Sequence, residues 1–176
     1  DYIVSDTSVI PPSLRPHYKE KVIYLPHSYM PTDNSLEISD IPITRKDMGL
    51  PEDGFVFCCF NNNYKISPRE FDIWMRLLHQ IDGSVLWLRQ SNQWAKNNLK
   101  KETIKRGVDS SRLIFAEKIS TGNHLARHKF ADIFLDTFNF NAHSTASDAL
   151  WAGLPLITKS GNQYTARVAT SLLKAI

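Results

Sequence analysis

From residue 51 onward, short apolar runs alternate with longer segments in which apolar residues recur at helical spacing. The apolar runs have the length and the β-branched or aromatic content of buried strands, and they cover residues 55–60, 85–88, 112–115, 133–135 and 156–158. The pattern predicts strands and helices that alternate about five times. Such alternation is typical of a parallel sheet with right-handed crossovers, a Rossmann-like, doubly wound α/β fold.

Five segments between or after these runs are predicted to be helical: residues 68–81, 92–106, 120–130, 145–152 and 163 onward. The first has the clearest start. Ser67 and Glu70 have the spacing of a capping box, in which each side chain bonds the backbone of the other residue. Pro68 stands at the first helical position, where its missing N–H costs nothing.

Residues 1–50 differ from the rest because they are rich in proline and show one strand pattern, at 22–26. We interpret this region as the end of another unit followed by a linker, and residues 51–176 as one α/β lobe. The chain starts without Met, and its last residues carry an amphipathic pattern that stops at Ile176. We therefore expect a piece of a longer protein, with the second lobe truncated at its end.

The composition of the 176-residue chain is that of an ordinary globular protein, with 42% apolar and 22% charged residues. A net charge of +3 gives no support to nucleic-acid or membrane binding, and no apolar run reaches transmembrane length. Cys58 and Cys59 are adjacent, so they point to opposite faces of a strand and should not pair. This usage favours a reducing, cytoplasmic compartment.

Polar residues follow the strand at 133–135. Thr145 and Asp148 fit a helix-capping pattern, and a free helix N-terminus favours an anion. His143 and Ser144 add hydrogen-bond donors, while Asp148 could accept from a ribose hydroxyl. The segment is therefore either a phosphate and ribose site or simply a capped helix.

Two further segments are candidates for the same site. After the strand at 55–60, residues 61–65 place three Asn and Lys65 where a pyrophosphate could bind; the alternative is a solvated polar loop. His124 and Arg127 share a face of the helix at 120–130, where they could contact a nucleotide or simply face solvent. His124 and His128 have metal-ligand spacing, but no carboxylate or Cys joins them.

Several of these segments resemble the O-linked N-acetylglucosamine transferase and SPINDLY family. The resemblance rests on Phe60-Asn61-Asn62-Asn63-Tyr64-Lys65-Ile66-Ser67-Pro68, Ser84-Val85-Leu86-Trp87-Leu88, Ala131-Asp132 to Asp136-Thr137, His143-Ser144-Thr145 and Asp148-Ala149-Leu150-Trp151-Ala152-Gly153-Leu154-Pro155. The first residues, Asp1-Tyr2-Ile3 and Glu20 to His27, are similar to the lead-in to the family's second lobe.

The resemblance implies the C-terminal, donor-binding lobe of a GT-B glycosyltransferase that uses a nucleotide sugar and needs no metal or other cofactor. Lys65 matches the lysine that contacts the diphosphate, and it is the implied catalytic residue. The implied substrate-binding residues are Asn63, which takes the place of a glutamine, and Ile119, His124, Arg127, His143, Ser144, Thr145 and Asp148. Residues 1–50 would then be a remnant of the first lobe and a linker. A first lobe and tetratricopeptide repeats would precede the chain, and a protein or peptide would be the acceptor.

Two positions depart from the family pattern: Ala142 replaces a glycine, and Thr121 stands where the GlcNAc transferases have a lysine. Family members use UDP-GlcNAc, UDP-glucose or GDP-fucose, and His143 and Asp148 favour a UDP sugar. We therefore expect a lobe that binds UDP-GlcNAc for transfer to Ser or Thr of proteins. The rivals are a non-catalytic nucleotide-sugar-binding module and a family member with one of the other donors.

Overall fold

The computed structural model describes residues 1–176 and contains a five-stranded, fully parallel sheet in the order β5-β4-β3-β6-β7. Its strands are β3 (Val56–Cys59), β4 (Val85–Arg89), β5 (Leu113–Ala116), β6 (Ile133–Leu135) and β7 (Leu156–Ile157). All five predicted strands are present, so the alternation of apolar runs located the sheet correctly.

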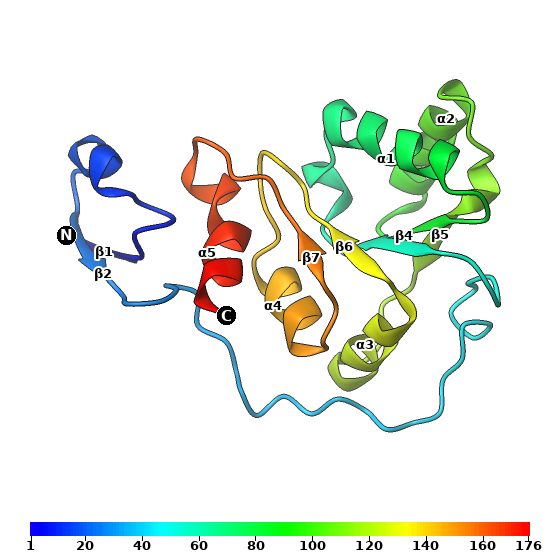
Figure 1. Ribbon diagram of the computed structural model, residues 1–176, viewed down its shortest axis with the longest axis horizontal. Helices are drawn as coiled ribbons and strands as arrows, with labels where there is room; N and C mark the ends of the chain where they lie inside the picture. Colours follow the sequence, from blue (N-terminus) through cyan, green and yellow to red (C-terminus); the bar gives the residue numbers. More distant parts are fainter.

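Helices cover both faces of the sheet (Figure 1). The helices are α1 (Pro68–Gln80), α2 (Gln93–Lys105), α3 (Thr121–Arg127), α4 (Ser144–Trp151) and α5 (Val168–Ala175). In Figure 1, α1 and α2 lie on one face, α3 and α4 lie on the other, and α5 lies beyond β7. The chain winds outward from β3 to β5 and then returns to β6 beside β3. This confirms the doubly wound, Rossmann-like class.

The start of α1 has the predicted capping box. The Ser67 backbone N–H donates to Glu70 Oε1 at 2.9 Å, and the Ser67 hydroxyl hydrogen-bonds the other oxygen of the same carboxylate. Glu70 is fully buried, so these bonds and the nearby helix N-terminus satisfy its charge.

Removing the Ser67 hydroxyl should therefore destabilise the protein. Ser67→Ala is expected to lower the free energy of unfolding by about 1–2 kcal/mol, since it removes a cap and leaves one Glu70 oxygen without its partner. Urea unfolding at pH 7 measures the change, with the exposed Ser160→Ala as the control. Equal unfolding midpoints for the two variants would contradict the prediction.

The N-terminal region holds a second, two-stranded parallel sheet made of β1 (Tyr2–Ser5) and β2 (Lys21–Tyr24). The sequence predicted β2 but not β1, because four residues with no flanking pattern give little periodicity. Val9 and Ile10 pack against Val168 at the start of α5. The buried Asp6 carboxylate also accepts a hydrogen bond from Ser171 Oγ at 2.7 Å, so α5 joins the two sheets.

One expectation for the end of the chain is wrong. The helix predicted from residue 163 is divided into a 3-10 turn (Tyr164–Ala166) and α5, with Arg167 between them. Trp151, the last residue of α4, is 47% exposed, and its indole N–H donates to the Leu36 carbonyl. No helix in residues 1–176 combines the length and the apolar character that crossing a membrane requires.

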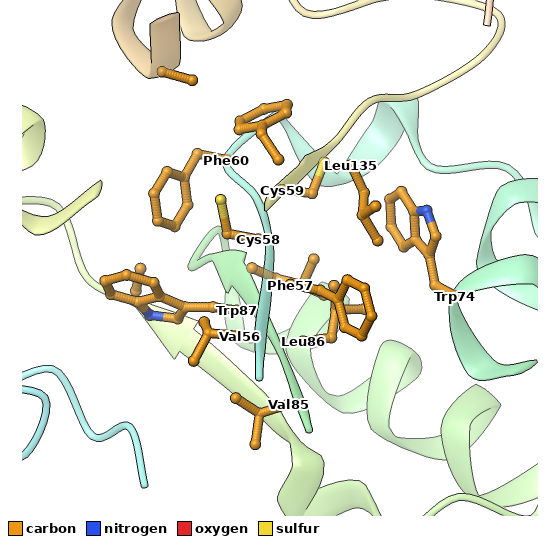
Figure 2. Packing of buried hydrophobic residues seen from close by; sticks show 14 of the residues in the cluster. Val56, Phe57, Cys58, Cys59, Phe60, Trp74, Val85, Leu86, Trp87 and Leu135 are labelled. Carbon is orange, nitrogen blue, oxygen red and sulfur yellow. The ribbon is translucent and has the colours of Figure 1, made fainter. Parts of the chain in front are cut away.

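The core confirms the interpretation of the two cysteines. Both are free and fully buried on β3. Figure 2 shows Cys58 on the same side of the sheet as Phe60 and Trp87, and Cys59 on the opposite side, toward Trp74. Neighbouring strand residues alternate between faces, so the two thiols cannot approach each other.

Candidate functional site

The order of the strands places two of the candidate loops next to each other. Strands β3 and β6 are neighbours, and the winding direction reverses between them. In doubly wound folds, ligands bind beyond the carboxyl ends of the strands at this reversal. The loops concerned are residues 60–67, after β3, and 136–143, after β6.

A buried asparagine, Asn61, connects these two loops to α4. Its side-chain amide donates to Asp136 Oδ1 at 3.1 Å and to Thr137 Oγ1 at 2.8 Å. Its Oδ1 accepts from Thr145 Oγ1 at 2.6 Å. Asn61 is fully buried, so each of its bonds replaces one that water would otherwise make.

The bond to Asn61 corrects the expected role of Thr145 as a helix cap. Helix α4 begins one residue earlier, at Ser144, and its N-cap residue is His143, whose side chain makes no capping bond. Thr145 therefore lies in the first turn, with its hydroxyl bonded to Asn61 rather than to an amide of α4. The first amides of α4 consequently have no capping side chain, so the partial positive charge there is available to an anion.

Lys65 lies next to this helix start. Its Nζ donates to the Asn141 carbonyl at 3.0 Å and lies 4.0 Å from the centroid of the Phe140 ring. Burial lowers the pKa of Lys65, while the negative charge of Asp136 raises it. An ammonium group has three donors, and the Asn141 carbonyl occupies one of them.

His143 completes this group. Its ring stacks on Phe140 with 4.9 Å between the centroids, and its Nε2 is buried without a hydrogen-bond partner. Burial, and then the neighbouring Lys65, lower the pKa of His143, so the ring is neutral at pH 7. Ser144 is exposed at the first position of α4. The ammonium, the imidazole and the helix start together make a site suited to a phosphate-like anion.

Asp136 lies beneath this site and is 2% exposed. Burial raises the pKa of Asp136 to about 6, and hydrogen bonds from Thr158, Ala142, Thr137 and Asn61 act against this rise. The carboxylate is therefore ionised at pH 7 and holds four donors.

The third candidate segment, the helix α3, packs against Phe60, the first residue of the loop after β3. Arg127 is the last residue of α3, is 4% exposed, and has its guanidinium 4.8 Å from the Phe60 ring centroid. It donates to the Glu117 carbonyl at 2.8 Å, and burial lowers its pKa to about 10. Arg127 thus points inward and supports the loop that contains Ile119, rather than sharing an exposed face with His124 near the helix start.

His124 and His128 pack on the other edges of Phe60, with ring centroids 5.2 Å from it in both cases. Burial lowers the pKa of His124 to about 3 and that of His128 to about 4. Both rings are neutral at pH 7. No group of three or more His, Cys, Asp or Glu side chains in residues 1–176 is placed to hold a metal ion.

The buried His128 gives a pH dependence with a definite sign. A histidine whose pKa falls from 6.5 to about 4 on folding contributes stability above pH 6.5 that is lost as the pH falls toward 4. His128→Asn keeps a donor for the His124 carbonyl but removes the titration. The dependence of the free energy of unfolding on pH should therefore become flatter by about 1.4 kcal/mol per pH unit near pH 5.

Urea unfolding between pH 4.5 and 6.5 measures this slope. The exposed His17→Asn is the control, and a His128→Asn slope equal to wild type would contradict the prediction.

Asn63 lies at the adjacent strand end. Its Nδ2 donates to the Arg89 carbonyl at 3.2 Å, at the end of β4, and its neighbour Asn62 accepts from the Arg89 guanidinium. Lys65, His143, Ser144 and Thr145 are therefore brought together directly, while Asn63 and the residues of α3 border them.

Buried polar atoms without a partner are concentrated in the three candidate segments. Six of them are Asn63 Oδ1, His124 Nδ1, Arg127 Nε, His128 Nε2, Asn141 Oδ1 and His143 Nε2, and two lie elsewhere, Trp87 Nε1 and Thr170 Oγ1. Native proteins leave few such atoms unpaired. Their concentration at one sheet edge indicates a place where a polar ligand or ordered water completes the bonding.

Asp148 opens into a cavity of about 430 Å³ on the same helix. Ser144, Ser147 and Asp148 supply polar groups, and Met30 and Leu36 contribute apolar surface from the segment that crosses α4. Burial raises the pKa of Asp148. The cavity shares Ser144 with the anion site, whereas Lys65 and His143 do not line it.

Sequence reasoning missed Asn61 and Asp136 as organising residues of the site. Asp136 directly follows β6, and Asn61 follows β3 after one intervening residue, Phe60. The two buried strands are neighbours in the sheet, and this position was the available signal. Their roles depend on contacts between residues about 75 positions apart, which no local pattern reveals.

Comparisons with known proteins indicate the family to which the chain is similar. The family model described as glycosyl transferase family 41 matches residues 32–176. A probable UDP-N-acetylglucosamine–peptide N-acetylglucosaminyltransferase of Arabidopsis thaliana, SEC, is 36% identical over 99% of the chain. The UDP-N-acetylglucosamine–peptide N-acetylglucosaminyltransferase of Caenorhabditis elegans is 35% identical over 85% of it.

A solved structure has the same fold. A mutant O-GlcNAc transferase of Thermobaculum terrenum superposes with a TM-score of 0.83 at 26% identity, and the match covers 99% of the chain. The chain spans only 18% of the Arabidopsis relative, 13% of the Caenorhabditis relative and 33% of the Thermobaculum chain. The likeness therefore concerns one region of larger proteins.

Proposed function

The chain belongs to glycosyl transferase family 41, and we propose that it forms the donor-binding lobe of a transferase that moves GlcNAc from UDP-GlcNAc to Ser or Thr of proteins. The observation that carries the proposal is the convergence of Lys65, His143 and the start of α4 at the reversal of the sheet. The printed names of the Arabidopsis and Caenorhabditis relatives support the choice of donor and acceptor.

In this proposal the reaction is a direct displacement at the anomeric carbon by an acceptor hydroxyl. The acceptor oxygen bonds to that carbon and its proton is released to water, while the bond from the carbon to the diphosphate breaks, so negative charge develops on the leaving UDP. Lys65, His143 and the uncapped amides of α4 are positioned before the reaction to stabilise that charge. Lys65 is the catalytic residue because its ammonium supplies the only full positive charge of this group.

The remaining candidates hold the nucleoside. Ser144 and Thr145 belong to the turn that receives the diphosphate, and Asp148, one helical turn further, accepts from the ribose hydroxyls in its cavity. The base lies near Ile119 and Arg127, and His124 of α3 is the other residue of the nucleotide pocket. Asn63 borders the site from the end of β4.

The proposal extends to the larger protein. The relatives are several times longer than the chain, so a first catalytic lobe and tetratricopeptide repeats would supply the acceptor site and bind the protein substrate. The proposal includes no metal, because Lys65 and the helix start face the diphosphate and offset part of its negative charge. The two free, buried cysteines support placement in the reducing cytoplasm.

A titration of the full-length protein with UDP, GDP and their sugars tests this function. We expect UDP and UDP-GlcNAc to bind at least tenfold more tightly than GDP and GDP-fucose, and GlcNAc to reach a peptide acceptor. Residues 1–176 alone should bind UDP weakly and transfer nothing. Tighter binding of GDP would identify a GDP-sugar enzyme, UDP-glucose as the preferred sugar would identify that donor, and binding without transfer would identify a non-catalytic module.

A further inference from the structure

The carboxylate of Asp136 accepts hydrogen bonds from three loops around the proposed diphosphate site. Its Oδ1 accepts from the backbone N–H of Thr137 at 2.8 Å, from that of Ala142 at 2.6 Å and from the Asn61 amide at 3.1 Å. Its Oδ2 accepts from Thr158 Oγ1 at 2.6 Å. One side chain thus joins the loops that follow β3, β6 and β7.

These bonds determine where the groups of the anion site lie. The Ala142 bond fixes the residue just before His143, at the entry to α4. Asn61, held by Asp136, accepts the Thr145 hydroxyl and so fixes the first turn of α4 from the other side. Asn141 directly precedes the anchored Ala142, and its carbonyl accepts a hydrogen bond from the Lys65 ammonium.

We infer that Asp136, acting through Asn61 and the Ala142 amide, is a positioning residue that sets Lys65 and the start of α4 at the diphosphate of the bound nucleotide. It does not touch the ligand, because it is 2% exposed and all four of its bonds go to the protein. This inference rests on the proposed function and adds the residue that makes the site rigid before the ligand arrives.

Asp132 provides a matched control at the other end of β6. It directly precedes β6, and its carboxylate accepts from the Val56 backbone N–H at 2.7 Å, at the start of β3. Asp132→Asn therefore changes an aspartate that bonds the backbone of β3 without changing the loops at the site. In Asp136→Asn, an NH₂ group takes the place of one carboxylate oxygen. It then faces either the three N–H donors that bond Oδ1 or the Thr158 hydroxyl that bonds Oδ2.

The test measures the affinities of the full-length Asp136→Asn protein for UDP and for uridine, which lacks the diphosphate. Calorimetry measures UDP, and ligand-observed NMR at millimolar concentration measures uridine. We expect UDP affinity to fall at least tenfold and uridine affinity to change less than twofold, with both unchanged in Asp132→Asn. A purely structural role would lower both affinities together through the loss of folded protein.

Asn61→Ala should reproduce the loss that is specific to the diphosphate, since it removes the link from Asp136 to Thr145. If Asp136→Asn does not fold, Thr158→Val removes the single Oδ2 bond and should lower UDP affinity about threefold without affecting uridine. Unchanged UDP affinity in these variants, or equal losses for both ligands, would overturn the inference. A wild-type protein that binds neither ligand would instead contradict the proposed function.

Discussion

Lys65→Ala is expected to lower kcat for sugar transfer by about 10²–10³-fold in the full-length protein. The reason is that, in the proposed reaction, Lys65 faces the charge that develops on the leaving diphosphate, and the loss of one such preorganised donor costs about 3–4 kcal/mol of transition-state stabilisation. Steady-state kinetics with varied donor concentration measure kcat and KM separately. KM should change less than kcat, because the ammonium interacts most strongly with the charge of the transition state.

Lys101→Ala is the matched control for this measurement. Lys101 lies exposed on α2, in a part of the lobe remote from the loops that follow β3 and β6, so its removal changes net charge equally without touching the site. Transfer by Lys101→Ala should equal wild type. If Lys65→Ala also transferred at the wild-type rate, Lys65 would have no catalytic role.

Phe60→Ala is expected to lower the free energy of unfolding by about 3–5 kcal/mol, a large part of the stability of a typical domain. The Phe60 ring is 1% exposed and contacts Trp87 and Arg127 together with both histidines of α3. Its loss leaves a cavity and removes the aromatic surface over the buried guanidinium. Urea unfolding followed by tryptophan fluorescence measures the change.

Phe55→Ala serves as the control, because Phe55 directly precedes β3, as Phe60 directly follows it, but is 37% exposed. We expect it to cost less than about 1.5 kcal/mol, since a half-exposed ring buries less apolar area. A Phe60→Ala variant no less stable than Phe55→Ala would show that Phe60 does not hold the two parts of the site together.

The sheet and most of its helices were predictable from sequence because their determinants are local. The runs at β3 and β4 are almost wholly apolar, as strands buried on both faces must be. The start of α1 is fixed by a capping box only four residues long. By contrast, β1 is four residues long and is stabilised by its pairing with β2, which the sequence pattern of β1 does not indicate.

The candidate loops were also predictable, because parallel strands bring their carboxyl ends to one edge of the sheet. The orientation of individual side chains was not. Thr145 bonds to Asn61, 84 positions earlier, instead of capping its own helix. Arg127 turns inward because Phe60 and Trp87 offer it aromatic surface on neighbouring strands. Both outcomes depend on long-range packing, which overrides the local pattern.

A crystal structure of residues 1–176 with bound UDP tests the central claim most directly. The account predicts diphosphate oxygens about 3 Å from Lys65 Nζ and from the first amides of α4, with the ribose hydroxyls at the Asp148 carboxylate. UDP bound at another surface, with the Lys65 ammonium and the start of α4 free of phosphate, would contradict it.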